Sequence, residues 1–169
     1  GALVFGRGLI AQQLLRSSKR FGRSAIIAAG VSDSSELRAG TYLREHMLIT
    51  KALRLKRPVF YFGSIGAAPL APSRYYRHKF RAEKRIAKAS RSNRVFCLPQ
   101  VFGPAGNQHT LVNFFFSKLQ KNERPTLQEN VFRVLIPVHL ISTLPSASFH
   151  SGLCGRMSVV HNVPLTPGQ

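Results

Sequence analysis

The chain has 169 residues, 44% of them hydrophobic, which is enough for one compact domain with its own core and excludes disorder throughout. It carries 25 Lys and Arg against 6 Asp and Glu, a formal net charge of +19. No apolar run approaches the roughly 18 residues of a membrane span, so we expect a soluble protein without membrane insertion.

Short apolar runs alternate with helical patterns along the chain, which is typical of βα units around a parallel sheet. The predicted strands, in chain order, cover residues 2–5, 25–29, 58–62, 94–98, 132–136 and 157–160. The predicted helices cover residues 8–17, 36–55, 74–90 and 110–121, with a helix or turn over 138–144. Ser34 or Ser35 is expected to cap the second helix. The sequence predicts a single Rossmann-like α/β domain over residues 1–169, with three layers and a mostly parallel sheet.

A GxGxxA motif, with Gly6, Gly8 and Ala11, directly follows the first predicted strand and opens a helix. Glycines in that context allow a tight turn and let backbone N–H groups approach a pyrophosphate at the helix N-terminus. The acidic residue that would hold the adenosine ribose about 20 positions further on is missing, and the next acid is Asp33. Close packing of the helix on the strand is an equally good explanation of the glycines.

A second motif, Tyr75-xxx-Lys79, lies on the helix predicted over residues 74–90, downstream of Ser64. A Tyr four residues before a Lys shares its helix face, so the ammonium can lower the pKa of the phenol. The phenol can then act as a general acid or base, while a Ser hydroxyl holds the substrate oxygen. A Tyr and a Lys at this spacing are common by chance, so the pair indicates a catalytic site only when the surrounding motifs agree with it.

The order of several motifs resembles that of the NAD-dependent epimerase/dehydratase family, the extended short-chain dehydrogenases, whose members act mostly on nucleotide sugars. The likeness covers roughly residues 2–140 and is closest to a compact bacterial variant that lacks the second βα region. After the glycine turn, the matching segments are residues 29–32, 61–64, 75–79, 98–103 and 106–111.

The resemblance implies a catalytic Tyr75 and Lys79 pair, with Ser64 as the hydroxyl partner. It also implies NAD or NADP as cofactor, held by two turns with the residues Gly6, Gly8, Ala11, Ala29 and Gly30. Residues 130–169 would be the remnant of a C-terminal substrate lobe, truncated relative to a full short-chain dehydrogenase.

The chain departs from that family at two places. A single Ser64 between glycines stands where the family has a run of Ser or Thr, and residues 136–140 lack the acidic residues of the corresponding family segment. Cys97 and Cys154 have no metal-ligand spacing, so we expect reduced cysteines and no metal site. A chain that begins at Gly1 fits a processed organelle protein and a trimmed piece equally well.

The excess of basic residues favours a polyanionic partner, because self-repulsion at this charge penalises the compact state and a polyanion relieves it. Solvated helix faces are the alternative explanation, but they leave the missing acidic residues unexplained. The residues expected to contact RNA are Arg16, Lys19, Arg20, Arg23, Arg77, Arg81, Lys84, Arg85, Lys88 and Arg91.

Two functional hypotheses follow from these observations. The favoured one is a structural subunit of a mitochondrial ribosome or similar ribonucleoprotein, which contacts rRNA and neighbouring proteins and requires no cofactor. The alternative is an active NAD(P)-dependent oxidoreductase or epimerase of a nucleotide sugar, with Tyr75 as acid/base and Lys79 lowering its pKa.

Overall fold

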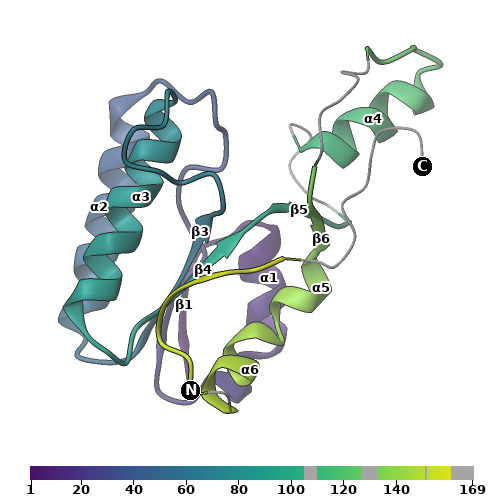
Figure 1. Ribbon diagram of the computed structural model, residues 1–169. Helices are drawn as coiled ribbons and strands as arrows, with labels where there is room; N and C mark the ends of the chain where they lie inside the picture. The colour runs from purple at the N-terminus through teal and green to yellow at the C-terminus, as the bar shows by residue number, and fades with distance from the viewer. Residues whose placement is uncertain (105–109, 127–132, 151, 161–169) are drawn as a thin grey trace.

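A parallel five-stranded sheet forms the centre of the molecule (Figure 1). The computed structural model describes residues 1–104, 110–126, 133–150 and 152–160. The strands follow one another across the sheet in the order β1 (Leu3–Phe5), β2 (Ala25–Ile27), β3 (Val59–Ser64), β4 (Arg94–Leu98) and β7 (Gly155–Ser158). Every neighbouring pair is parallel, which confirms the predicted Rossmann-like α/β fold.

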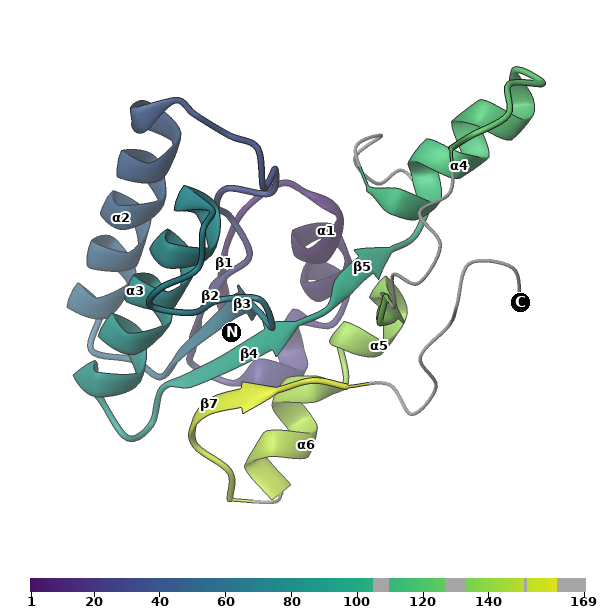
Figure 2. The ribbon, with the colours of Figure 1, turned by 45° about the horizontal axis from the view of Figure 1, so that its top comes forward.

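Helices cover both faces of the sheet and complete the three layers (Figure 2). One face carries the two longest helices, α2 (Ala39–Arg54) and α3 (Arg74–Ala89). The other carries α1 (Leu9–Arg16), the 3-10 helix η1 (Ser18–Phe21), α5 (Val138–Ile141) and α6 (Leu144–His150). The three inner strands β2, β3 and β4 are largely buried on both sides, as is usual for a parallel sheet.

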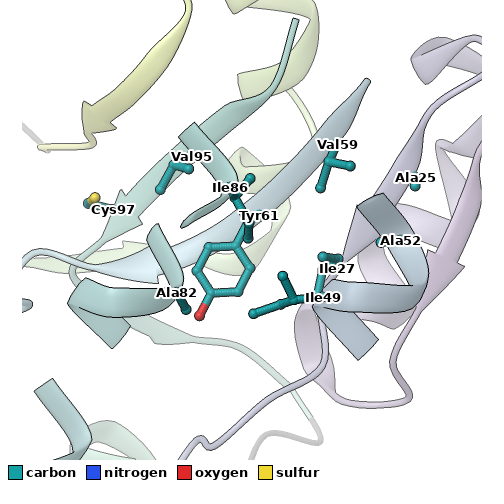
Figure 3. Close-up of a cluster of buried hydrophobic side chains, with 10 residues drawn as sticks. All are labelled: Ala25, Ile27, Ile49, Ala52, Val59, Tyr61, Ala82, Ile86, Val95 and Cys97. Carbon is teal, nitrogen blue, oxygen red and sulfur yellow. The ribbon is translucent and has the colours of Figure 1, made fainter. Parts of the chain in front are cut away.

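The two faces have separate hydrophobic clusters. Under α2 and α3, Ile49 and Ile86 pack onto alternate strand residues, and Tyr61 extends from β3 toward the helix that carries Ala82 (Figure 3). Under α1 and α5, Leu14 and the phenylalanines of β3 and β4 form the other cluster. Alternation along each strand thus gives β3 and β4 one set of side chains for each face.

Helix α1 lies on the opposite face from α2 and α3, although the three connections all carry the chain one strand further in the same direction. Two crossover connections between parallel strands that move in the same direction across the sheet have the same handedness only when their helices lie on the same face of the sheet. The β1–α1–β2 connection therefore has the opposite hand to the next two. At least one crossover is left-handed, whereas about 98% of such connections are right-handed.

A smaller unit extends from the end of β4. Strands β5 (Gln100–Phe102) and β6 (Leu135–Pro137) pair in parallel, and α4 (Leu111–Gln120) projects away from the main sheet in both views (Figures 1 and 2). Among the residues that the structure describes, no helix is long and apolar enough to cross a membrane.

Several details differ from the sequence predictions. Helix α2 begins at Ala39 instead of residue 36, because the Glu36 carboxylate accepts hydrogen bonds from the backbone N–H and Nε of Arg38 and so forms a turn. Neither Ser34 nor Ser35 caps it, since Arg38 is the N-cap residue. Strand β7 begins two residues earlier than predicted, and strand β5 and helix α6 were not predicted.

Candidate active site

The carboxyl ends of β1 to β4 lie at one edge of the sheet, because all four strands are parallel. Helices α1, α2 and α3 begin at this edge, where the predicted cofactor and catalytic residues gather. The change of face between α1 and α2 sends the loops after β1 and β2 to opposite sides of the sheet. Open α/β sheets bind ligands at such a point.

The first turn at this edge requires a glycine and leaves the next helix uncapped. Gly6 has a φ of +143°, and a Cβ there would lie 2.4 Å from the carbonyl oxygen of Ala28. Gly8 is the N-cap residue of α1, where no side chain caps the helix and no acidic residue occupies its first turn. Ala11 is fully buried one turn further on. The N-terminus of α1 is therefore available to an anion.

The second predicted turn, Ala29 and Gly30, lies against a buried carboxylate. A Cβ on Gly30 would lie 2.4 Å from Oε1 of Glu45, and the backbone N–H of Val31 donates to Oε2 at 3.1 Å. Glycine at position 30 therefore allows the Glu45 side chain of α2 to reach the end of β2.

Glu45 is the centre of a buried polar network that sequence reasoning missed. It is 0% exposed and accepts hydrogen bonds from Lys79 Nζ at 2.8 Å and the Tyr61 hydroxyl at 2.6 Å. Its other oxygen lies 3.0 Å from His78 Nε2. Burial alone would raise the pKa of Glu45, but the hydrogen bond from His78 and the charge of Lys79 lower it to about 2. The carboxylate is therefore the counter-ion of Lys79.

The structure brings Tyr75 and Lys79 together but does not show the predicted lowering of the Tyr75 pKa. Lys79 Nζ lies 5.7 Å from the centroid of the half-buried Tyr75 ring. Burial raises the pKa of Tyr75 well above its usual range, and the Glu45 carboxylate raises it further. Burial of the phenol is the main physical reason, and Glu45 in addition offsets the charge that Lys79 would direct at the phenol. Tyr75 therefore keeps its proton at neutral pH.

Ser64 is the last residue of β3, and the loop that follows it packs against the part of α3 that carries Tyr75 and Tyr76. Its Oγ accepts a hydrogen bond from the backbone N–H of Gly66 at 3.3 Å. A Cβ on Gly66 would lie 2.7 Å from the ring of Tyr76, and the rings of Tyr75 and Tyr76 are 5.0 Å apart. The loop that carries the predicted hydroxyl thus packs against Tyr76, whose ring contacts that of the predicted acid/base.

A second buried carboxylate, Glu83 on α3, repeats the arrangement of Glu45. The backbone N–H of Ser64 donates to its Oε1 at 3.0 Å, and Arg156 Nε donates to Oε2 at 2.7 Å. A Cβ on Gly63 would lie 2.2 Å from Oε1. Burial, followed by the charge of Glu83, raises the pKa of the nearby Cys97 thiol to about 12.

The sequence contained a weak signal for both carboxylates. Each is a lone acid on a basic helix, and each accepts the backbone N–H that directly follows a glycine at the end of a strand. An isolated acid with a strand-ending glycine upstream is therefore the pattern that could have identified them.

The ten residues expected to contact RNA fall into separate groups. Those between positions 16 and 23 lie at the amino edge of the sheet, opposite the glycine turn. Arg77 donates to the carbonyls of Ala71 and Pro72, and Arg85 donates to Thr50 on α2, so these two guanidinium groups bind the fold itself. Arg81, Lys84, Lys88 and Arg91 are exposed on or just after α3.

Solved structures of nucleotide-sugar enzymes share this fold. The chain superposes on UDP-glucose 4-epimerase from Thermus thermophilus, solved with NAD, with a TM-score of 0.68 at 14% identity, over 98% of this chain and 78% of the epimerase. For UDP-N-acetylglucosamine 4-epimerase from Bacillus cereus the TM-score is 0.67 at 17% identity, over 98% and 76%. For dTDP-glucose 4,6-dehydratase from Bacillus anthracis, solved with NAD, it is 0.66 at 11% identity.

The last match covers 95% of this chain but only 59% of the dehydratase, so the chain is truncated relative to such enzymes. No family profile matches the sequence, and no curated protein matches it significantly. The predicted likeness to the NAD-dependent epimerase/dehydratase family therefore holds at the level of the fold.

These findings overturn the prediction of an RNA-contacting subunit of a mitochondrial ribosome. The structural neighbours are nucleotide-sugar epimerases and dehydratases, and nothing in them or in the described residues indicates a ribosomal role or a mitochondrial location. The prediction was wrong because it took the basic excess to indicate an RNA partner, although some of these side chains have partners within the chain. Arg77 and Arg85, two of the residues it relied on, bind backbone and side-chain groups of the chain itself.

Proposed function

We propose that this chain is the dinucleotide-binding part of an NAD(P)-dependent oxidoreductase or epimerase that acts on a nucleotide sugar. The observation that carries the proposal is the shared position of the uncapped glycine turn and the Tyr75/Lys79 pair at one edge of the sheet. The fold shared with NAD-containing epimerases and dehydratases supports it.

The residues at the glycine turn fit the phosphates of a dinucleotide. The close approach of Gly6 to Ala28 narrows the turn, and the open space around Gly8 leaves the helix N-terminus accessible. Backbone N–H groups and the helix dipole would then receive the pyrophosphate. Ile27, Ala28 and Ala29 at the end of β2 are apolar and offer no carboxylate to the ribose, and the Glu45 carboxylate that reaches this point already binds Lys79. Affinity would therefore depend mainly on the phosphates.

In this proposal Tyr75 acts first as a proton donor. Its raised pKa means that the phenol is protonated at neutral pH, which suits reduction of a carbonyl group. When bound, a reduced nicotinamide would supply the hydride for the carbonyl carbon, and the Tyr75 hydroxyl would give its proton to the carbonyl oxygen. Ser64, on the adjacent loop, would hold that oxygen, and Lys79 would stabilise the tyrosinate that remains.

The test is turnover of UDP-glucose or a UDP-4-keto sugar with NAD(H), followed by nicotinamide absorbance and by NMR of the sugar. Removing the phenol in Tyr75→Phe should reduce kcat by roughly 100-fold or more, with the affinity for NADH unchanged. Tyr76→Phe is the matched control, since it removes the neighbouring hydroxyl from the same helix turn. Equal rates in both variants, or the absence of any turnover, would refute the proposal.

A further inference from the structure

A basic hollow lies between α2 and α3, on the face of the sheet away from α1. Its volume is about 310 Å³, and its lining residues are Tyr42, Arg74, Arg77, His78 and Arg81. The four residues from α3 follow a spacing of three, four and seven positions, so they share one side of that helix. Three guanidinium groups thus converge on a space at the lower end of the size range of small-ligand sites.

Two of the guanidinium groups are held in place by neutral partners. Arg77 Nη1 donates to the carbonyl oxygens of Ala71 and Pro72 at 2.7 and 2.6 Å. Arg74 donates to the carbonyl oxygen of Leu37 at 3.2 Å and stacks 4.6 Å from the centroid of the Tyr42 ring. Because these contacts fix the side chains before any ligand arrives, binding would cost little conformational entropy.

The three arginines of this lining have no acidic partner among the described residues, whereas His78 contacts Glu45. Across the part of the chain that the structure describes, no carboxylate forms an ion pair with Arg74, Arg77 or Arg81. Two carboxylates near the lining residue Tyr42 bind other groups, since Glu45 pairs with Lys79 and Glu36 pairs with Arg38. Three neighbouring cations without a counter-ion repel one another, and a multiply charged anion relieves that repulsion.

We infer that this hollow is a binding site for a compact, multiply charged phosphate anion, of which pyrophosphate is the simplest example. Guanidinium groups match phosphate oxygens with paired, charge-assisted hydrogen bonds. The hollow size favours one diphosphate group, either as free pyrophosphate or as part of a nucleoside diphosphate. The site is separate from the glycine turn and does not depend on the proposed enzymatic function, since α1 lies on the other face of the sheet.

The experiment is isothermal titration of the whole chain with inorganic pyrophosphate and, separately, with ADP. Arg81→Gln removes one exposed guanidinium from the lining, and Lys84→Gln removes one exposed charge from the same helix outside it. We expect saturable binding that weakens about tenfold or more in Arg81→Gln and less than about twofold in Lys84→Gln. The net charge of the two variants is the same, so only the position of the lost charge differs.

The two titrants distinguish the sources of the diphosphate. Tighter binding of ADP would indicate a nucleotide, and equal or tighter binding of pyrophosphate would indicate the free anion, while both support the site. Equal weakening of anion binding in the two variants would mean that the anion binds to a diffuse basic surface, which overturns the inference. It is also overturned if neither titrant binds at millimolar concentration, or if only substitution of Gly8 at the α1 N-terminus weakens binding.

Discussion

Replacing Gly8 by Asp separates the stability of α1 from its capacity to bind a dinucleotide. Gly8 has φ −74° and ψ −176°, a conformation open to any residue, and its Cβ position has no heavy atom within 4 Å. An Asp there can cap the N-terminus of α1, which now has no side-chain cap. The carboxylate also complements the helix dipole, so we expect the free energy of unfolding to rise by about 0.5 kcal/mol.

The same carboxylate would oppose a bound pyrophosphate. Two unit charges about 5 Å apart at an effective dielectric constant of about 20 repel by roughly 3 kcal/mol. NADH should therefore bind roughly 100-fold more weakly to Gly8→Asp than to the unmodified chain. The measurement is a titration followed by nicotinamide fluorescence, together with thermal unfolding without ligand.

Gly8→Asn is the matched control, because it has the same shape and can cap the helix without a charge. Its affinity for NADH should stay within a few-fold of the unmodified chain. If NADH binds equally well to the Asp and Asn variants, the dinucleotide does not use the N-terminus of α1, and the assignment of the glycine turn is wrong.

Two further predictions concern the buried carboxylates. The pKa of Glu45 is lowered, so the network contributes stability that is present above the ordinary carboxyl pKa and is lost as pH falls toward about 2. Urea unfolding from pH 6 to pH 2 should show a loss of roughly 3 kcal/mol, and a smaller one in Glu45→Gln; parallel curves would contradict this. Gly63→Ala places a Cβ 2.2 Å from a buried carboxylate oxygen and should destabilise the chain by about 2 kcal/mol or more. Gly40→Ala, in open space on α2, is the control and should stabilise the chain by about 0.5 kcal/mol. Similar Tm shifts for the two variants would show that Gly63 does not lie in tight contact with the Glu83 carboxylate.

The strands and helices of the sheet could be predicted because their signals are local. Strand β4 and helix α3 match the prediction within a residue, since a continuous apolar run and a 3.6-residue pattern depend on neighbouring positions. The start of α2 could not be predicted, because the Glu36 carboxylate competes with helix formation through the Arg38 backbone. The bounds of strand β7 differ from the prediction because its register depends on pairing with β4, 61 residues away in sequence.

The candidate site could be predicted only in part, and the reason is electrostatic. The positions of Tyr75, Lys79 and the glycine turn follow from a known order of motifs, but the partner of Lys79 does not. Glu45 lies 34 residues from Lys79, and only the packing of α2 on α3 brings them within 2.8 Å. The packing of α2 on α3 also brings Arg85 to Thr50, although a count of charges assigns this arginine to the surface.

The placement of α1 on its own face of the sheet affects how the chain matures during synthesis. The layer of α2 and α3 needs only residues up to β4, so it can close as soon as β4 has left the ribosome. The opposite layer contains Leu14 and Phe21 near the start of the chain and Ile141 near its end. Helices α1 and η1 emerge early and cover part of this face, but until α5 and α6 emerge the four strands β1 to β4 are only partly covered on the side that carries Phe62 and Phe96. A nascent chain in that state exposes an apolar surface that chaperones bind and that promotes aggregation, so the C-terminal helices protect the N-terminal half of the protein.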